Sequence, residues 1–140
     1  MLIAITGILI FGIFEMQIMA LTEGVNSAGR VLAVSSGLTL DPCNTAASAI
    51  QSAAPMLNAS NLSYQIVLNP TPSLGATSNH SYSGSTCSST STATGAPGYL
   101  VSTGSVTVTA TYANCSLKFF GNNLMPSGCQ VSQSITEVVQ

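Results

Sequence analysis

The first 35 residues of the chain have a hydrophobic pattern typical of one long helix. Apolar residues alternate in spacings of three and four, which places them on one helix face: Phe11, Phe14, Ile18, Leu21, Val25, Ala28 and Leu32. Up to Phe14 the other positions are apolar too, whereas polar residues from Thr22 to Arg30 gather away from that face. The pattern predicts a helix of about 50 Å that starts without a polar side and ends amphipathic.

A second helix is predicted directly after this one. Asp41 is a suitable N-cap, Pro42 suits the first turn, and apolar residues share one face up to about Leu57. Two later segments, from Leu62 to Leu68 and from Val106 to Tyr112, alternate between apolar and polar residues and predict half-buried strands.

The end of the chain predicts one further strand. Val131, Ile135 and Val139 share a face, although Gln133 and Glu137 lie on it as well. No helical pattern separates the late strands, so we expect an α+β fold with a three- to four-stranded antiparallel sheet. One face of the sheet should pack on the second helix and on the C-terminal half of the long one.

Two regions follow from this order. Residues 1–36 form a hydrophobic helix, a filament core or a membrane anchor, and residues 37–140 form a globular α+β domain with a Ser/Thr-rich loop at 70–98. Within it, residues 77–96 hold twelve Ser or Thr in twenty positions, too polar for a core. We expect this segment on the outside, held by Cys87.

Glu15 interrupts the most apolar part of the chain, and Gln17 follows it. An apolar run that ends at Phe14 is short for a membrane span, which needs about 20 residues. No basic residue precedes the run and no small-residue cleavage site closes it, so it does not resemble a signal peptide either. We expect other copies of the chain, or lipid, to cover this helix, and we expect Glu15 at a contact between copies. Its partner there would be Arg30 of another copy, a hydroxyl group or the N-terminal amine of a neighbour.

Charged residues make up only 4% of the chain, and two of them are basic. So few cations cannot follow a phosphate backbone, which argues against nucleic-acid binding. A surface of Ser, Thr, Asn and Gln suits a chain that is assembled, glycosylated or both. Four Asn-x-Ser sequons offer glycosylation sites at Asn58, Asn61, Asn79 and Asn114.

Four cysteines occur without a C-x-x-C pair, and His80 is the only histidine. An even count in such a chain favours two disulfides and an extracytoplasmic location over a zinc site. We favour Cys115–Cys129, because both flank a short loop between predicted strands, and then Cys43–Cys87 by elimination. No paired carboxylates, phosphate loop or nucleophile motif is present, so we expect no enzyme activity, no catalytic or metal site and no cofactor.

The start of the chain resembles the TadE-like pilins and pseudopilins of Tad-type pili. Phe11-Gly12-Ile13-Phe14-Glu15 and Ala28-Gly29-Arg30 match the pattern of their long helix, and residues 104–140 resemble their late strands. The basic leader and cleavage glycine of that family are not among these residues, so Met1 falls several residues inside the mature helix.

The resemblance implies a structural subunit of an extracellular filament, serving adhesion or surface attachment, with no small-molecule substrate. Its partners would be copies of itself and, before assembly, the inner-membrane pilus machinery. Subunit contacts are expected at Phe11, Phe14, Glu15, Ile18 and Arg30. A minor pseudopilin that primes or caps a filament is the alternative within the family, and a membrane-anchored extracytoplasmic binding module is the alternative outside it.

Overall fold

The computed structural model describes residues 2–36, 38–39, 41–69, 80–84, 100, 102–113, 118–119, 122–123 and 128–140. The fold is α+β, as predicted. Its elements are α1 (Leu2–Val34), α2 (Pro42–Ala53), a 3-10 turn (Ala59–Asn61), β1 (Leu62–Asn69), β2 (His80–Gly84), β3 (Ser105–Ala113), β4 (Lys118–Phe119), β5 (Asn122–Asn123) and β6 (Gln130–Val138).

Four strands form one antiparallel sheet in the order β2-β1-β3-β6, and β4 and β5 form a small separate pair. The alternation read from the sequence decides which side chains face inward. Leu62, Tyr64, Ile66 and Leu68 of β1 are buried, and so are Val106, Val108, Ala110 and Tyr112 of β3. Both predicted strands are therefore confirmed, with the predicted faces.

The opposite face of the sheet is lined by hydroxyl groups. Between β3 and β6 three directly opposed pairs are hydrogen-bonded, Thr107–Thr136 at 2.8 Å, Thr109–Ser134 at 2.9 Å and Thr111–Ser132 at 3.1 Å. Such cross-strand pairs stabilise a sheet and fix its register. The low content of charged residues predicts a surface of this uncharged, polar kind.

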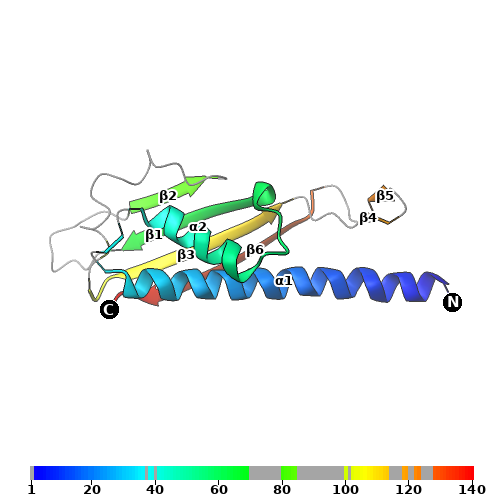
Figure 1. Ribbon diagram of the computed structural model, residues 1–140, viewed down its shortest axis with the longest axis horizontal. Helices are drawn as coiled ribbons and strands as arrows, with labels where there is room; N and C mark the ends of the chain where they lie inside the picture. Colours follow the sequence, from blue (N-terminus) through cyan, green and yellow to red (C-terminus); the bar gives the residue numbers. More distant parts are fainter. Residues whose placement is uncertain are drawn as a thin grey trace.

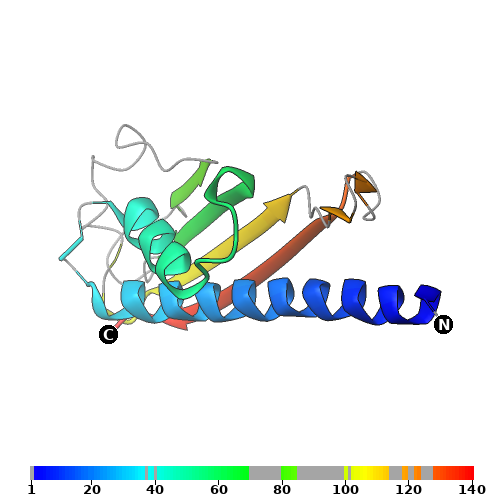
Figure 2. The same ribbon diagram turned by 45° about the vertical axis from the view of Figure 1, so that its right-hand side comes forward.

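Both helices cover the apolar face of the sheet (Figure 1). α1 contacts β3 and β6, while α2 lies between α1 and β1. The core includes four buried residues from the second half of α1, Leu21, Val25, Ala28 and Leu32. That half of α1 thus belongs to the same hydrophobic core as the sheet, and the first half extends beyond it (Figure 2).

The second helix begins as predicted but ends earlier. The carboxylate of Asp41 accepts a hydrogen bond of 2.8 Å from the backbone N–H of Asn44, which is an N-cap interaction. The helix ends at Ala53 rather than near Leu57, because Pro55 disfavours helical backbone in the residue before it and has no N–H to donate.

The final strand lies at the edge of the sheet and packs on α1. Val131, Gln133, Ile135 and Glu137 all face inward and are half-buried, so the mixed polarity noted in the sequence belongs to a face that is only partly covered. The chain end is fixed by a 2.9 Å hydrogen bond from the N–H of Gln140 to the carbonyl of Ala33. β6 therefore runs alongside the C-terminal half of α1.

The Ser/Thr-rich segment was predicted to be a loop over 70–98, and this is wrong in one part. Residues 80–84 form β2, which pairs with β1 from Tyr64 to Leu68. Pairing satisfies the backbone groups on that edge of β1, which outweighs the low apolar content of the segment. The rest of the segment, and with it Cys87, lies outside the described residues, so its outward position stays a prediction.

Candidate interaction surface

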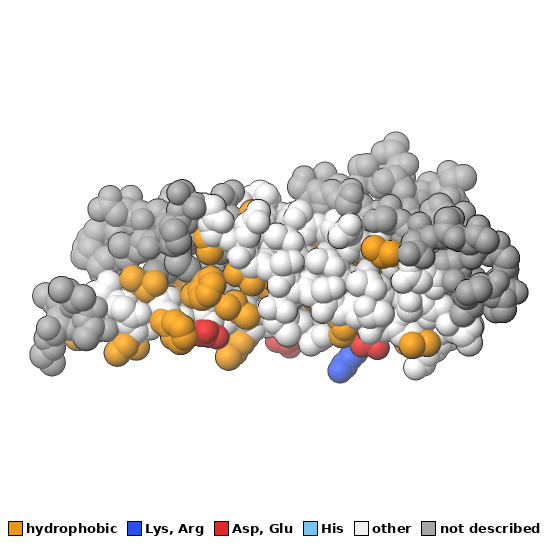
Figure 3. Space-filling model, turned by 180° about the vertical axis from the view of Figure 1, so that it is seen from behind, with side chains coloured by type: hydrophobic (Ala, Val, Ile, Leu, Met, Phe, Trp, Pro, Cys, Tyr) orange, Lys and Arg blue, Asp and Glu red, His pale blue; other side chains and the backbone are white. Residues whose placement is uncertain are grey.

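The first half of α1 exposes its apolar side chains. Seven large ones are between 41% and 73% exposed: Ile5, Ile8, Leu9, Phe11, Ile13, Met16 and Met19. Seen from behind, hydrophobic side chains gather over this half of the helix around one acidic side chain, and the other charged side chains lie further along it (Figure 3). An apolar surface of this extent marks a site that another molecule covers.

The apolar run was expected to end at Phe14, but the apolar part of α1 continues beyond Glu15. From Ile5 to Val34 the helix is long and apolar enough to cross a membrane, with only 6% of its most apolar window buried inside the chain. A single carboxylate interrupts a stretch that continues to Leu21, and a helix tolerates one such residue. A membrane-associated helix is therefore compatible with α1.

The five predicted contact residues occupy two separate places. Phe11 is 65% exposed, and Phe14, Glu15 and Ile18 are half-buried, all in the first half of α1. Arg30 is exposed twelve residues beyond Ile18, about 18 Å along the helix. The structure thus groups four of the five and separates Arg30 from them.

Two polar side chains near the start of the core have no partner within the described part of the chain. Glu15 makes no hydrogen bond or ion pair there. The side-chain oxygen Oε1 of Gln17 is buried and accepts no hydrogen bond. Unpaired polar groups on an apolar helix are costly to cover unless the covering molecule supplies partners.

The helix glycines fall into two groups. A Cβ at residue 24 would lie 3.1 Å from Cγ2 of Ile50, and one at residue 29 would lie 2.9 Å from Cγ2 of Ile135. Gly24 and Gly29 therefore allow α2 and β6 to approach α1. A Cβ at Gly7 or Gly12 would meet nothing within 4 Å among the described residues, so no close approach by that part of the chain requires these two.

Sequence reasoning identified the inward seam of α1 but missed a second stripe on the outward side. It comprises Ile5, Leu9, Gly12, Met16, Met19, Glu23 and Arg30, and its large side chains are exposed. The spacings of four, three, four, three, four and seven keep these residues on one side of a helix. This signal was present in the sequence, but only the position of the sheet shows which stripe faces outward.

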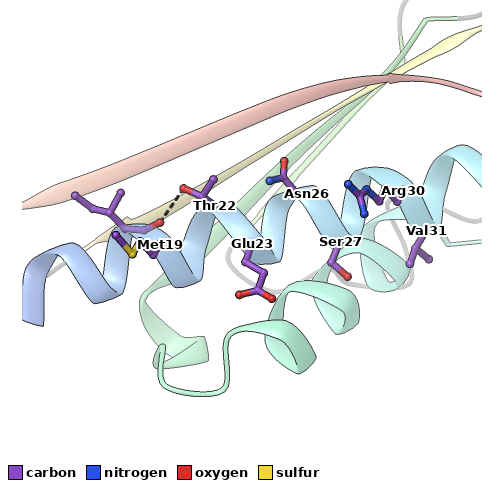
Figure 4. A pocket seen from close by; sticks show the side chains of 8 residues that line it. Met19, Thr22, Glu23, Asn26, Ser27, Arg30 and Val31 are labelled. Carbon is purple, nitrogen blue, oxygen red and sulfur yellow. Dashed lines mark hydrogen bonds between the residues drawn. The ribbon is translucent and has the colours of Figure 1, made fainter.

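Glu23 and Arg30 border a shallow, open groove of about 640 Å³ along α1. Its lining also includes Ile18, Met19, Thr22, Asn26, Ser27 and Val31. All of these belong to one helix, so the groove is surface relief rather than an enclosed cavity. In the close-up view the side chains of Glu23 and Arg30 do not meet (Figure 4), and neither has an ion-pair or hydrogen-bond partner among the described residues.

Cys43 and Cys129 are both disulfide-bonded, and no cysteine in the described part of the chain is free. The topology argues against a bond between these two. Cys43 precedes Ile50 by seven helical residues, about 10 Å, and Cys129 precedes Ile135 by six strand residues, about 20 Å. α2 crosses α1 obliquely and runs back along it, whereas β6 runs in the same direction as α1 (Figure 2). Along α1 these steps therefore point in opposite directions and separate the cysteines far beyond the roughly 7 Å limit.

Cys87 and Cys115 lie outside the described residues, so the pairing itself stays a prediction. Ala113 pairs with Gln130 in the sheet. Cys115 comes two residues after Ala113, and Cys129 comes one residue before Gln130. We expect non-reducing peptide mapping to show Cys115–Cys129 and Cys43–Cys87, each stabilising the domain by about 2–4 kcal/mol. A free thiol at either member of the first pair, or a peptide joining Cys43 to Cys129, would contradict this.

Two of the four sequon asparagines lie in the described part. Asn58 is exposed, and its Oδ1 accepts hydrogen bonds from the backbone N–H and the hydroxyl of Ser60, whereas Asn61 is half-buried. Asn79 and Asn114 lie outside it. Among the described residues no three His, Cys, Asp or Glu side chains are close enough together to hold a metal ion.

The comparisons with known proteins give no match. No protein-family model matches the chain, and no curated protein or solved structure is significantly similar to it. The architecture is a long apolar N-terminal helix packed on a small antiparallel sheet. That architecture and the exposed surface of α1 are therefore the features that bear on function.

Proposed function

We propose that this chain is a structural subunit of a pilus-like filament outside the cell and that it polymerises through α1. The observation that carries this proposal is the contrast between the two halves of α1. The second half is anchored in the domain core, while seven large apolar side chains of the first half are exposed. Copies of the same helix are a cover that the chain itself provides, and repeated contacts that do not close into a ring build a fibre.

The resemblance of residues 11–15 and 28–30 to the helix of TadE-like pilins supports the same proposal. In such a filament the α1 helices form the core, and the sheet with its hydroxyl-lined face lies outward. The subunits pass through the membrane as a pool that the pilus assembly machinery uses, and the assembled filament serves adhesion or surface attachment. A minor pseudopilin that primes or caps a filament of another protein would use α1 in the same way.

One observation favours a second candidate, a membrane-anchored extracytoplasmic binding module. α1 is long and apolar enough to span a bilayer, and its most apolar window is almost entirely uncovered by the domain. Lipid would then replace the neighbouring copies as the cover. Both candidates leave the α+β domain outside the membrane.

Electron microscopy of native surface material separates these candidates. The filament proposal expects helical fibres with this subunit as the repeating unit, labelled along their length by an antibody against the domain. A minor subunit would be labelled at one end only. A chain that stays in the membrane fraction, with no labelled fibres, would contradict the filament proposal and support the anchored module.

A further inference from the structure

The outward stripe of α1 changes from apolar to charged along the helix. From Ile5 to Met19 it holds no charge, and it then carries Glu23 and, seven residues later, Arg30. Seven residues are two turns, or about 10.5 Å, so the two charges lie on the same side of α1 but do not meet (Figure 4). Arg30 is one of two basic residues in the whole chain.

Gly12 adds an independent observation about the same stripe. Glycine in a helix interior costs roughly 0.5–1 kcal/mol relative to alanine, and a Cβ at Gly12 would meet nothing within 4 Å in the described part of the chain. At Gly24 and Gly29 this cost is offset, because the missing side chain leaves space for Ile50 and Ile135 to pack against α1. By the same reasoning, Gly12 leaves space for a group from another molecule to approach α1 closely.

Three ways of packing a second α1 on this stripe differ in how they treat the charges. Parallel helices in register place Glu23 beside Glu23 and Arg30 beside Arg30, which is repulsive. Antiparallel helices centred between the two charges pair both of them. The apolar halves then extend past each other in opposite directions and stay exposed.

A parallel arrangement with a displacement of seven residues satisfies both requirements. It places Glu23 of one copy level with Arg30 of the next. It also places Leu9 level with Met16, and Gly12 level with Met19, so the exposed apolar half of one helix covers that of its neighbour. Among parallel arrangements, the displacement of seven residues is the one that brings Glu23 level with Arg30, and so places opposite charges together.

We infer that α1 helices of several copies gather in parallel around a common axis, each with a neighbour displaced by about 10.5 Å, and that Glu23 pairs with Arg30 of that neighbour. This rests on the proposed filament function and adds the partner residue and the axial step. It assigns Arg30 to Glu23 rather than to Glu15, because Glu15 lies on the half-buried flank of α1 and Arg30 on the exposed side.

Charge exchange tests the pair directly. Glu23→Arg and Arg30→Glu each place like charges together, so each should lower the fibre yield by roughly tenfold or more. The double exchange, Glu23→Arg with Arg30→Glu, should restore the yield to within about threefold of the original chain. The matched control, Glu15→Arg with Arg30→Glu, should not restore it. Circular dichroism should show a folded domain in every variant, since neither Glu23 nor Arg30 has a partner within the described chain.

Cysteine cross-linking tests the displacement. A chain with both Leu9→Cys and Met16→Cys should form a ladder of cross-linked multimers on mild oxidation of fibres, because these positions meet between displaced neighbours. The two single variants should form no cross-link. Dimers from either single variant would show helices in register and overturn the inference.

The outcomes separate this inference from the function on which it rests. Fibres that survive both single charge reversals, or that the double exchange fails to restore, overturn the pair and its step while leaving the filament function standing. If the unmodified chain forms no fibres at all, the filament function fails and the inference fails with it.

Discussion

Replacing Glu15 by leucine is expected to leave the α+β domain folded but to give fewer or irregular fibres. Glu15 is half-buried on a part of the helix where, apart from Gln17, the neighbouring side chains are apolar, and it has no partner within the described chain. When copies of α1 cover it, a hydroxyl or amine group of a neighbour must satisfy the carboxylate, because Arg30 is assigned to Glu23. Loss of the carboxylate leaves that neighbouring group unsatisfied, which costs about 1–3 kcal/mol for each contact.

The change should affect order as well as yield. Leucine, isoleucine and phenylalanine tolerate several sliding registers between packed helices, whereas one buried polar group favours a single register. Glu15→Gln is the matched control and should be milder, because its amide still forms hydrogen bonds. Fibre yield and helical diffraction from electron micrographs measure both effects. If Glu15→Leu assembles with unchanged symmetry and yield, Glu15 does not set the register.

Replacing Gly24 by leucine is expected to destabilise the domain itself. A Cβ at this position would lie 3.1 Å from Cγ2 of Ile50 and 3.3 Å from the backbone oxygen of Ile50, so a leucine side chain must push α2 away from α1. Overpacking of this kind costs typically 1–3 kcal/mol, and more when backbone must move. Thermal unfolding followed by circular dichroism should show a melting temperature lower by several degrees.

Gly12→Leu provides the matched control on the same helix. A Cβ at Gly12 meets nothing within 4 Å where the structure is described, and leucine has a helix propensity close to 1 kcal/mol better than glycine, so the melting temperature should not fall. Fibre yield should fall instead, because the larger side chain occupies the space that a neighbouring helix needs. Equal loss of thermal stability in both variants would contradict the division of the glycines into two groups.

Much of the fold could be predicted from the sequence, because local periodicity determines which segments become helices and strands. The three-four spacing from Leu21 to Leu32 and the alternation in β1 and β3 each depend on residues a few positions apart. The N-cap at Asp41 is equally local and was predicted correctly. Signals of this kind need no knowledge of what an element packs against.

One error arose because a distant part of the chain decides the outcome, and two arose from local signals that were weighed wrongly. The segment around β2 is too polar to indicate a strand, and it becomes one through pairing with β1. The helix after Asp41 was extended to Leu57 on its apolar spacing, although Pro55 stops it. The helix was predicted as one element and is one, but its apolar run was judged too short for a membrane span, although an apolar stretch long enough to cross a membrane extends past Glu15.

At the candidate interaction surface, the sequence and the tertiary structure determine different properties. The sequence by itself determined that α1 is long, apolar at its start and nearly free of charge, and that Glu15 is out of place there. It could not determine that Phe11, on the same seam as Leu21, is 65% exposed while Leu21 is fully buried. Only the tertiary structure decided this, because the sheet and α2 cover α1 along one half of its length. Exposure of a helix face depends on where its covering elements end, and no local pattern encodes that.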